Sequence, residues 1–188
     1  MPAATSRRPA RRSDARDRLL ATASRLFYAE GVNSVGVDRI VSESQVTLAT
    51  FYRHFPSKEH LVVGYLEGVH ELIAAQLTAS IGEAQGRDRV RAIGAGVTAE
   101  LNQKGFRGCA FINAASEFED PQSPVRRVVA QHRRWYYELA RSAFAQAGHG
   151  RPGNAARPAV GLRPAGRSQR RGSRFSRMAN QAADLSFR

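Results

Sequence analysis

The residues of this chain whose types and spacing could do chemistry gather between positions 47 and 58, and that chemistry is binding to nucleic acid. A helix that enters a DNA major groove needs a narrow N-terminal end with side chains that reach base edges, and polar or basic flanks for phosphates. The segment has both properties. The predicted DNA contacts are Thr47, Leu48, Ala49, Thr50, Tyr52, Arg53, His54 and Lys58.

Two short amphipathic segments must position these side chains. The first spans Val37–Ser44 and the second Leu48–Phe55, and only three residues separate them, which predicts a helix-turn-helix. Phe51 and Phe55 are four residues apart and should pack inward. Pro56 then ends the second helix, because proline disfavours the α conformation of the residue before it.

A longer helix is predicted on each side of this pair. The first has an apolar stripe through Leu19, Leu20 and Leu26, and Ser13 is its expected N-cap. The second starts after Ser57, which can cap it, and continues to about Ile81. A helix of that length can bridge two domains.

Residues 31–61 resemble the DNA-binding domain of the TetR/AcrR family of bacterial transcriptional regulators. The similarity is strongest over residues 47–61, through Thr-Phe-Tyr-Arg-His-Phe at 50–55 and Ser-Lys-Glu-x-Leu at 57–61. The resemblance covers roughly residues 13–147. It is strong to about residue 80 and weaker beyond, where it includes Arg-Gly-Cys-Ala-Phe-Ile-Asn-Ala-Ala-x-Glu at 107–117. The resemblance implies a homodimeric regulator, most often a repressor, that binds double-stranded operator DNA and releases it when a small molecule binds.

Three positions depart from the family pattern. Gln45 occupies a turn where glycine is usual, so a left-handed backbone there would cost about 1–2 kcal/mol more than with glycine. Val35 and Gly36 replace the usual threonine and serine before the second helix, which leaves glycine as a weaker cap. These departures concern the stability of the motif and not its identity.

The chain as a whole is predicted to be all-α. Apolar spacing indicates one further helix over residues 90–101 and a short one at Cys109–Phe118, and Ser123-Pro124 opens a third. The expected organisation is a disordered basic arm at 1–12, a helix-turn-helix domain at 13–56, a helical ligand-binding and dimerisation domain at 57–147, and a disordered tail at 148–188.

Aromatic and apolar residues of the second domain could line a cavity for a small apolar effector. Asn113 and Glu117 would be its polar anchors, and an ordinary aromatic core is the alternative interpretation. The predicted pocket comprises Phe106, Cys109, Phe111, Ile112, Asn113, Glu117, Trp135, Tyr136 and Phe144.

Enzymatic and metal-dependent functions are not favoured. Cys109 would need a base such as His132 or Glu117, yet cysteine and histidine on apolar helical stripes usually belong to a core. None of the five histidines forms a pair with the spacing of metal ligands. The sequence therefore predicts no catalytic residue, no metal and no cofactor.

The net charge of +13 resides mainly at the two ends of the chain. Residues 1–18 carry six arginines and two aspartates, and residues 148–188 carry nine arginines and one aspartate, whereas residues 19–147 have a net charge of +1. A nonspecific basic nucleic-acid-binding protein that acts through these tails is therefore the alternative function. No apolar run approaches the roughly 18 residues of a spanning helix, so we expect no membrane partner and a cytoplasmic location.

Arginine, glycine, proline and alanine make up 25 of the 41 residues from 148 to 188, and large apolar residues are few. Such a composition fits an out-of-frame reading of GC-rich DNA, and a genuine basic tail is the other explanation. Relatives in the resembled family usually end with two further helices that form the dimer interface. A chain without them would leave apolar helix faces uncovered, so its homodimer is expected to be impaired.

Overall fold

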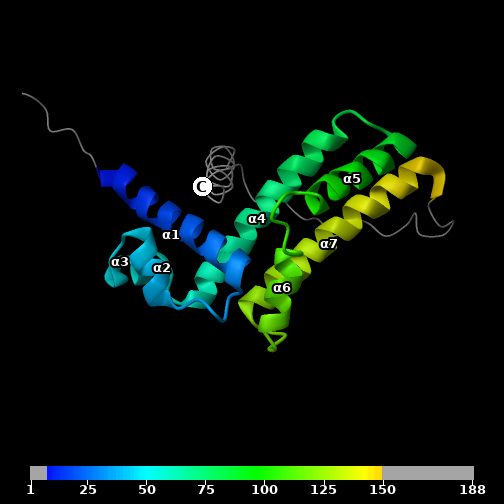
Figure 1. Cartoon of the computed structure of the whole chain (residues 1–188). Helices are drawn as coiled ribbons and strands as arrows, with labels where there is room; N and C mark the ends of the chain where they lie inside the picture. Colours follow the sequence, from blue (N-terminus) through cyan, green and yellow to red (C-terminus); the bar gives the residue numbers. More distant parts are fainter. Residues whose placement is uncertain (1–7, 150–188) are drawn as a thin grey trace, which may run out of the picture.

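The computed structural model of this chain describes residues 8–149, with side chains from residue 14 onward. This range contains seven α-helices, a short π-helical turn and no strand, which confirms the all-α prediction (Figure 1). Most of the predicted basic arm and residues 150–188 of the predicted tail lie outside the described residues. The elements are α1 (Arg8–Glu30), α2 (Val37–Ser44), α3 (Leu48–His54), α4 (Lys58–Ile81), α5 (Gly86–Leu101), α6 (Ala110–Glu117), α7 (Pro124–Phe144) and the turn η1 (Ala145–His149).

Helix α1 begins at Arg8, which corrects the predicted start at Ser13. Residues 8–12 of the predicted arm therefore belong to the helix. Pro9 is the second residue of α1, and proline is tolerated in the first turn of a helix because its missing N–H would be unpaired there. The alanine and arginines that follow have good helix propensity, so no polar cap at residue 13 is required.

The predicted starts of α2, α3, α4 and α7 are confirmed, and α6 begins one residue after the predicted Cys109. Helix α5 begins at Gly86, which corrects the predicted range 90–101, because the apolar residues that start at Val90 do not include its first turn. The Oγ atom of Ser57 accepts a hydrogen bond from the His60 N–H, and α4 ends at Ile81 as expected. Likewise, the Oγ atom of Ser123 accepts from the Arg126 N–H, and Pro124 is the first residue of α7. Each cap satisfies a backbone N–H that has no partner within its helix.

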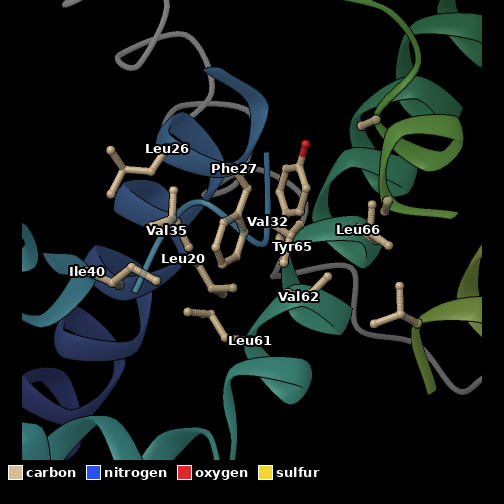
Figure 2. Packing of buried hydrophobic residues seen from close by; sticks show 14 of the residues in the cluster. Leu20, Leu26, Phe27, Val32, Val35, Ile40, Leu61, Val62, Tyr65 and Leu66 are labelled. Atoms are coloured by element: carbon tan, nitrogen blue, oxygen red, sulfur yellow. The ribbon is translucent and has the colours of Figure 1, made fainter. Parts of the chain in front are cut away.

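Helices α1, α2 and α3 pack around one hydrophobic core. Phe51 and Phe55 are 0% and 3% exposed, so α3 is anchored by the face that the sequence predicts to be inward. The first turns of α4 enter the same core through Leu61, Val62 and Tyr65 (Figure 2). Helix α4 is therefore shared between the DNA-binding helices and the rest of the molecule.

The remainder of α4 packs with α5, α6 and α7 to form a second group of helices (Figure 1). We call them the sensor helices, after the ligand-binding role predicted for residues 57–147. Phe111, Val125 and Val129 are buried where α6 and α7 meet α4. Helix α5 has no fully buried side chain. Among the described residues, none of these helices is both long and apolar enough to cross a bilayer.

Candidate nucleic-acid interface

Helix α3 presents one face to solvent while its aromatic face is buried. Leu48 and Tyr52 are 44% and 51% exposed. Thr47, Ala49 and Arg53 are also exposed, and Thr50, His54 and Lys58 are half-buried. All eight predicted DNA contacts thus lie on α3 or at the helix ends next to it, and five of them are exposed.

The N-terminal end of α3 is organised by its own side chains. The Oγ1 atom of Thr47 accepts a hydrogen bond from the Thr50 N–H at 3.2 Å and lies 2.9 Å from the Thr50 hydroxyl. The guanidinium of Arg53 donates to that same hydroxyl at 3.3 Å. Thr47 therefore has a structural role as N-cap, and Thr50 is already oriented by two neighbours.

Lys58 is the first residue of α4 and is half-buried. Burial lowers the pKa of its ammonium group, and the carboxylate of Glu117 partly opposes that shift. A cation at a helix N-terminus also opposes the helix dipole, an unfavourable arrangement that an incoming phosphate would relieve.

An ion-pair network joins α1 to α2 behind the turn. Arg39 donates to both carboxylate oxygens of Glu30, at 2.6 and 2.8 Å, and to Glu43 at 2.9 Å. Arg25 of α1 pairs with Glu43 as well. These hydrogen bonds lower the pKa of both Glu30 and Glu43, and they raise the pKa of Arg39. Of this network, only the Arg39–Glu43 contact has a signal in the sequence, because their four-residue spacing is typical of a helical ion pair.

The turn between α2 and α3 adopts the conformation that glycine would favour. Gln45 has φ 54° and ψ 44°, which is the left-handed region. Its N–H donates to the Ser42 carbonyl, and the N–H of Val46 donates to the Val41 carbonyl, so two of the carbonyls at the end of α2 are satisfied. At the other end of α2, Gly36 makes no side-chain cap, as its lack of a side chain requires.

Two sets of hydrogen bonds tie the DNA-binding helices to α6. The Glu117 carboxylate accepts from the Val32 N–H at 2.9 Å and the Asn33 N–H at 2.5 Å. The Tyr28 hydroxyl accepts from the Arg107 N–H at 2.9 Å and donates to the Gly108 carbonyl at 3.2 Å. Tyr28 and Asn33 were not expected from the sequence, because their partners are about 80 residues away.

Part of the predicted pocket comes together around a buried histidine. The ring of Phe111 stacks on His132 with centroids 3.5 Å apart, and Trp135 and Tyr136 lie beside the same imidazole. Burial lowers the pKa of His132 to about 4 and raises that of Tyr136 to about 12. Cys109 is half-buried against this core. We call Phe111, His132, Trp135 and Tyr136 the aromatic cluster.

Other predicted pocket residues lie elsewhere. Glu117, expected as a polar anchor, instead has both carboxylate oxygens on the loop after α1. The Asn113 side chain donates to the Arg107 carbonyl at 3.2 Å. Ile112 and Phe144 are 59% and 47% exposed, and Phe106 is half-buried. Helical periodicity places residues on a face, but it does not determine which neighbour covers that face.

Two of the histidines lie next to each other, although their spacing in the sequence gives no sign of it. His70 of α4 and His132 of α7 are 62 positions apart, yet their Nδ1 atoms are 2.9 Å from each other. Within residues 8–149, no group of three histidine, cysteine or acidic side chains is arranged to hold a metal ion. The two imidazoles therefore bind each other through their Nδ1 atoms.

Comparison with known proteins gives a match over the DNA-binding helices. Residues 19–64 match the family model described as bacterial regulatory proteins, tetR family. This range extends from the core of α1 through α3 and into the first turns of α4. It therefore covers all of the predicted DNA contacts.

Similar proteins extend the match over most of the described residues. The crystal structure of SCO4454, a TetR-family transcriptional regulator from Streptomyces coelicolor, is 47% identical and superposes with a TM-score of 0.68 over 71% of each chain. The HTH-type transcriptional repressor NemR of Escherichia coli (strain K12) is 28% identical over 134 residues, or 70% of this chain and 67% of NemR. A structure of reduced E. coli NemR superposes with a TM-score of 0.61 over 70% of each chain.

Proposed function

Because this chain belongs to the TetR family of bacterial transcriptional regulators, we propose that it is a repressor that releases its operator when a small apolar effector binds the sensor helices. DNA binding and transcriptional regulation follow from membership of the family. The repressor assignment is supported by the relative NemR, which is named as a repressor. Operator sequence, effector and direction of regulation are the finer parts of the proposal.

One observation carries the DNA-reading part of the proposal. The phenylalanines of α3 are buried in the core, whereas the N-terminal end of the helix is exposed to solvent. Thr47, Leu48 and Ala49 form an accessible N-terminal edge, and short side chains there allow close approach to base pairs. Tyr52 and Arg53 flank that edge, and Lys58 lies at the start of the next helix. We assign base contacts to the first group, including Thr50, and phosphate contacts to Tyr52, Arg53, His54 and Lys58.

A homodimer would present two copies of α3 to the DNA. Two recognition helices related by a two-fold axis reach successive major grooves when they are roughly 34–36 Å apart, or a multiple of that, on a palindromic site. We propose that the sensor helices supply the dimer contact. Tyr137 of α7 is 64% exposed and Phe144, at the end of the same helix, 47%, so this helix offers apolar side chains to a second copy.

The effector site is proposed at the aromatic cluster. Phe111, Trp135 and Tyr136 provide apolar surface, and the neutral form of His132 favoured by its low pKa adds no charge. A small, largely apolar molecule suits such a lining better than an ion does. Cys109 lies at the N-terminus of the helix that carries Phe111 and belongs to the same proposed site.

Selection of duplexes from random DNA, followed by competition with random duplex, tests the function. The proposal expects a palindromic preference that persists after residues 1–7 and 150–188 are removed. The alternative, a basic protein that binds any nucleic acid through its arginine-rich ends, is motivated by the net charge of +1 over residues 19–147. Loss of all binding on removal of the ends, with no palindrome preferred, would establish that alternative instead.

Once an operator is known, compounds can be screened for release of labelled operator DNA. Linkage requires that operator DNA weaken a true effector by the same factor by which the effector weakens the operator. Substituting Phe111 with alanine should reduce the effect of an active compound. A compound that is equally active on that variant would not bind at the aromatic cluster.

A further inference from the structure

Helix α6 is attached to the DNA-binding helices at both of its ends. Before it, the backbone of Arg107 and Gly108 is bound by the Tyr28 hydroxyl of α1. At its last residue, Glu117 accepts the N–H groups of Val32 and Asn33 in the loop that leads from α1 to α2. We call these two contacts, made by Tyr28 and Glu117, the α6 clasp. The clasp is a connection between the two groups of helices in addition to α4.

The Glu117 contact requires a carboxylate. Its two oxygens accept from two consecutive backbone N–H groups, and each oxygen takes one of them. A glutamine could offer one carbonyl oxygen, but its NH₂ group would face the second N–H and could not accept from it. The loop is also shaped around this side chain: Gly31 has φ +89°, and a Cβ atom there would lie 3.2 Å from Glu117 Oε1.

The same helix is coupled to the aromatic cluster. Phe111 lies in the first turn of α6, is 1% exposed and stacks on His132 of α7. Arg126 of α7 donates to the Ala115 carbonyl of α6 at 2.9 Å. A molecule that entered between Phe111 and His132 would have to separate that stack, and a rigid two-turn helix would carry the displacement to Glu117.

We propose that the α6 clasp transmits the state of the aromatic cluster to the DNA-binding helices, with Glu117 and Tyr28 as positioning residues. The route runs from Phe111 along α6 to Glu117, then through Val32 and Asn33 to α2. This inference rests on the proposed effector-released function, and it specifies which side chains carry the coupling. Coupling between two sites is reciprocal, so operator binding at α3 must also be felt at the aromatic cluster.

Trp135 makes that reciprocal effect measurable. It is the single tryptophan of the sequence, and its ring lies 4.9 Å from that of Tyr136 and 5.0 Å from that of His70. Its emission therefore reports on the aromatic cluster, while the anisotropy of labelled operator DNA reports on α3. The two signals can be followed in one titration of the full-length protein.

The experiment compares Glu117→Gln and Tyr28→Phe with matched controls. Glu119→Gln removes the same charge two residues away at an exposed site, and Thr78→Val removes the hydroxyl of an exposed side chain of α4. We expect operator binding to change Trp135 emission in the wild type and in both controls. In Glu117→Gln and Tyr28→Phe, saturation with operator should leave the emission unchanged. A full emission change in both clasp variants, or none in the wild type at saturation, would overturn the proposal.

A second arm needs no DNA. Hydrogen exchange at the Val32 and Asn33 amides is measured with and without Phe111→Leu, in the wild-type and Glu117→Gln backgrounds. Coupled residues show interaction energies that correspond to at least about a twofold change, so Phe111→Leu should alter exchange by that factor only where Glu117 is present. An equal change in both backgrounds would show that Glu117 does not carry the coupling. Absence of any operator binding would refute the proposed function. The exchange measurement would then still show whether Glu117 couples Phe111 to the Val32 and Asn33 amides.

Discussion

The imidazole rings of His70 and His132 meet edge to face between α4 and α7, with their Nδ1 atoms 2.9 Å apart. One nitrogen must donate and the other accept, so at least one of the two rings has to be neutral. Burial lowers the pKa of both histidines, and the proximity of His70 lowers that of His132 further. Only the carboxylate of Glu71 favours the charged form of His70. The pair is thus a polar contact between helices that protonation of both rings would break.

This contact predicts a loss of stability in mild acid. The pKa of His132 falls from 6.5 in the unfolded chain to about 4 in the folded protein. Above pH 6.5 both states are neutral and the contribution is constant. As the pH falls from about 6.5 toward 4, His132 is protonated in the unfolded chain but stays largely neutral in the folded protein. The free energy of unfolding should therefore fall, by about 2–3 kcal/mol across this window.

Urea unfolding at a series of pH values measures this effect. His132→Phe keeps an aromatic ring beside Phe111 but cannot titrate, so its unfolding midpoint should depend less on pH between 6.5 and 4. His149→Gln removes an exposed histidine and serves as the control. An identical pH profile for the wild type and His132→Phe would show that His132 does not carry the effect.

The left-handed backbone of Gln45 predicts a stabilising substitution. Glycine avoids the Cβ strain at φ 54°, and part of the gain is offset by the greater freedom of glycine in the unfolded chain. Gln45→Gly should raise the free energy of unfolding by about 0.5–1 kcal/mol. Gln45→Ala removes the same side chain but keeps Cβ, so it should give no gain. Equal stabilisation by both variants would place the effect in the side chain and not in the backbone.

Phosphate and base contacts should respond differently to substitution. Lys58→Gln should weaken binding to every duplex to a similar extent and reduce the slope of log affinity against log salt by about one, because one phosphate contact is lost. Thr50→Val removes a hydroxyl with little change in shape and should alter the preference at one or two positions. Affinities for a panel of operator variants distinguish the two patterns, and a uniform loss for Thr50→Val would exclude that residue from base readout.

Thr47 needs a gentler substitution than Thr50. Its side chain caps α3, and removal of an N-cap costs about 1 kcal/mol, so Thr47→Ala would weaken DNA binding through the helix itself. Thr47→Ser keeps the capping oxygen and removes only the methyl group. We expect its thermal stability to be close to that of the wild type, with a changed base preference. Calorimetry and the same duplex panel measure the two quantities separately.

The sequence was informative where structure depends on near neighbours. Ser57 and Ser123 cap their helices three residues away, and Phe51 and Phe55 are buried because one helical turn separates them. The start of α1 was placed too late, since a serine is a good cap whether or not the chain uses it. Pro9 in the first turn was the available signal.

The parts that could not be predicted depend on contacts between distant residues. Glu117 and Val32 are 85 positions apart, and His70 and His132 are 62 apart, so no local pattern connects them. The sequence predicts Glu117 as a polar anchor of a pocket, whereas its carboxylate accepts hydrogen bonds from backbone N–H groups in the loop after α1. Such donors are invisible in a sequence, because every residue except proline carries one.

The ratio of specific to nonspecific DNA affinity, compared between wild type and Ala49→Glu, shows whether α3 reads the DNA sequence. Ala49 is exposed, so the fold should tolerate the change, but a carboxylate at the tip of α3 would face bases and phosphates. Ala75→Glu adds the same charge at an exposed site in the second half of α4 and is the control. We expect a ratio of about 10³ or more for wild type and Ala75→Glu, and a ratio near unity for Ala49→Glu. A sequence preference undiminished in Ala49→Glu would contradict the claim that α3 reads the DNA.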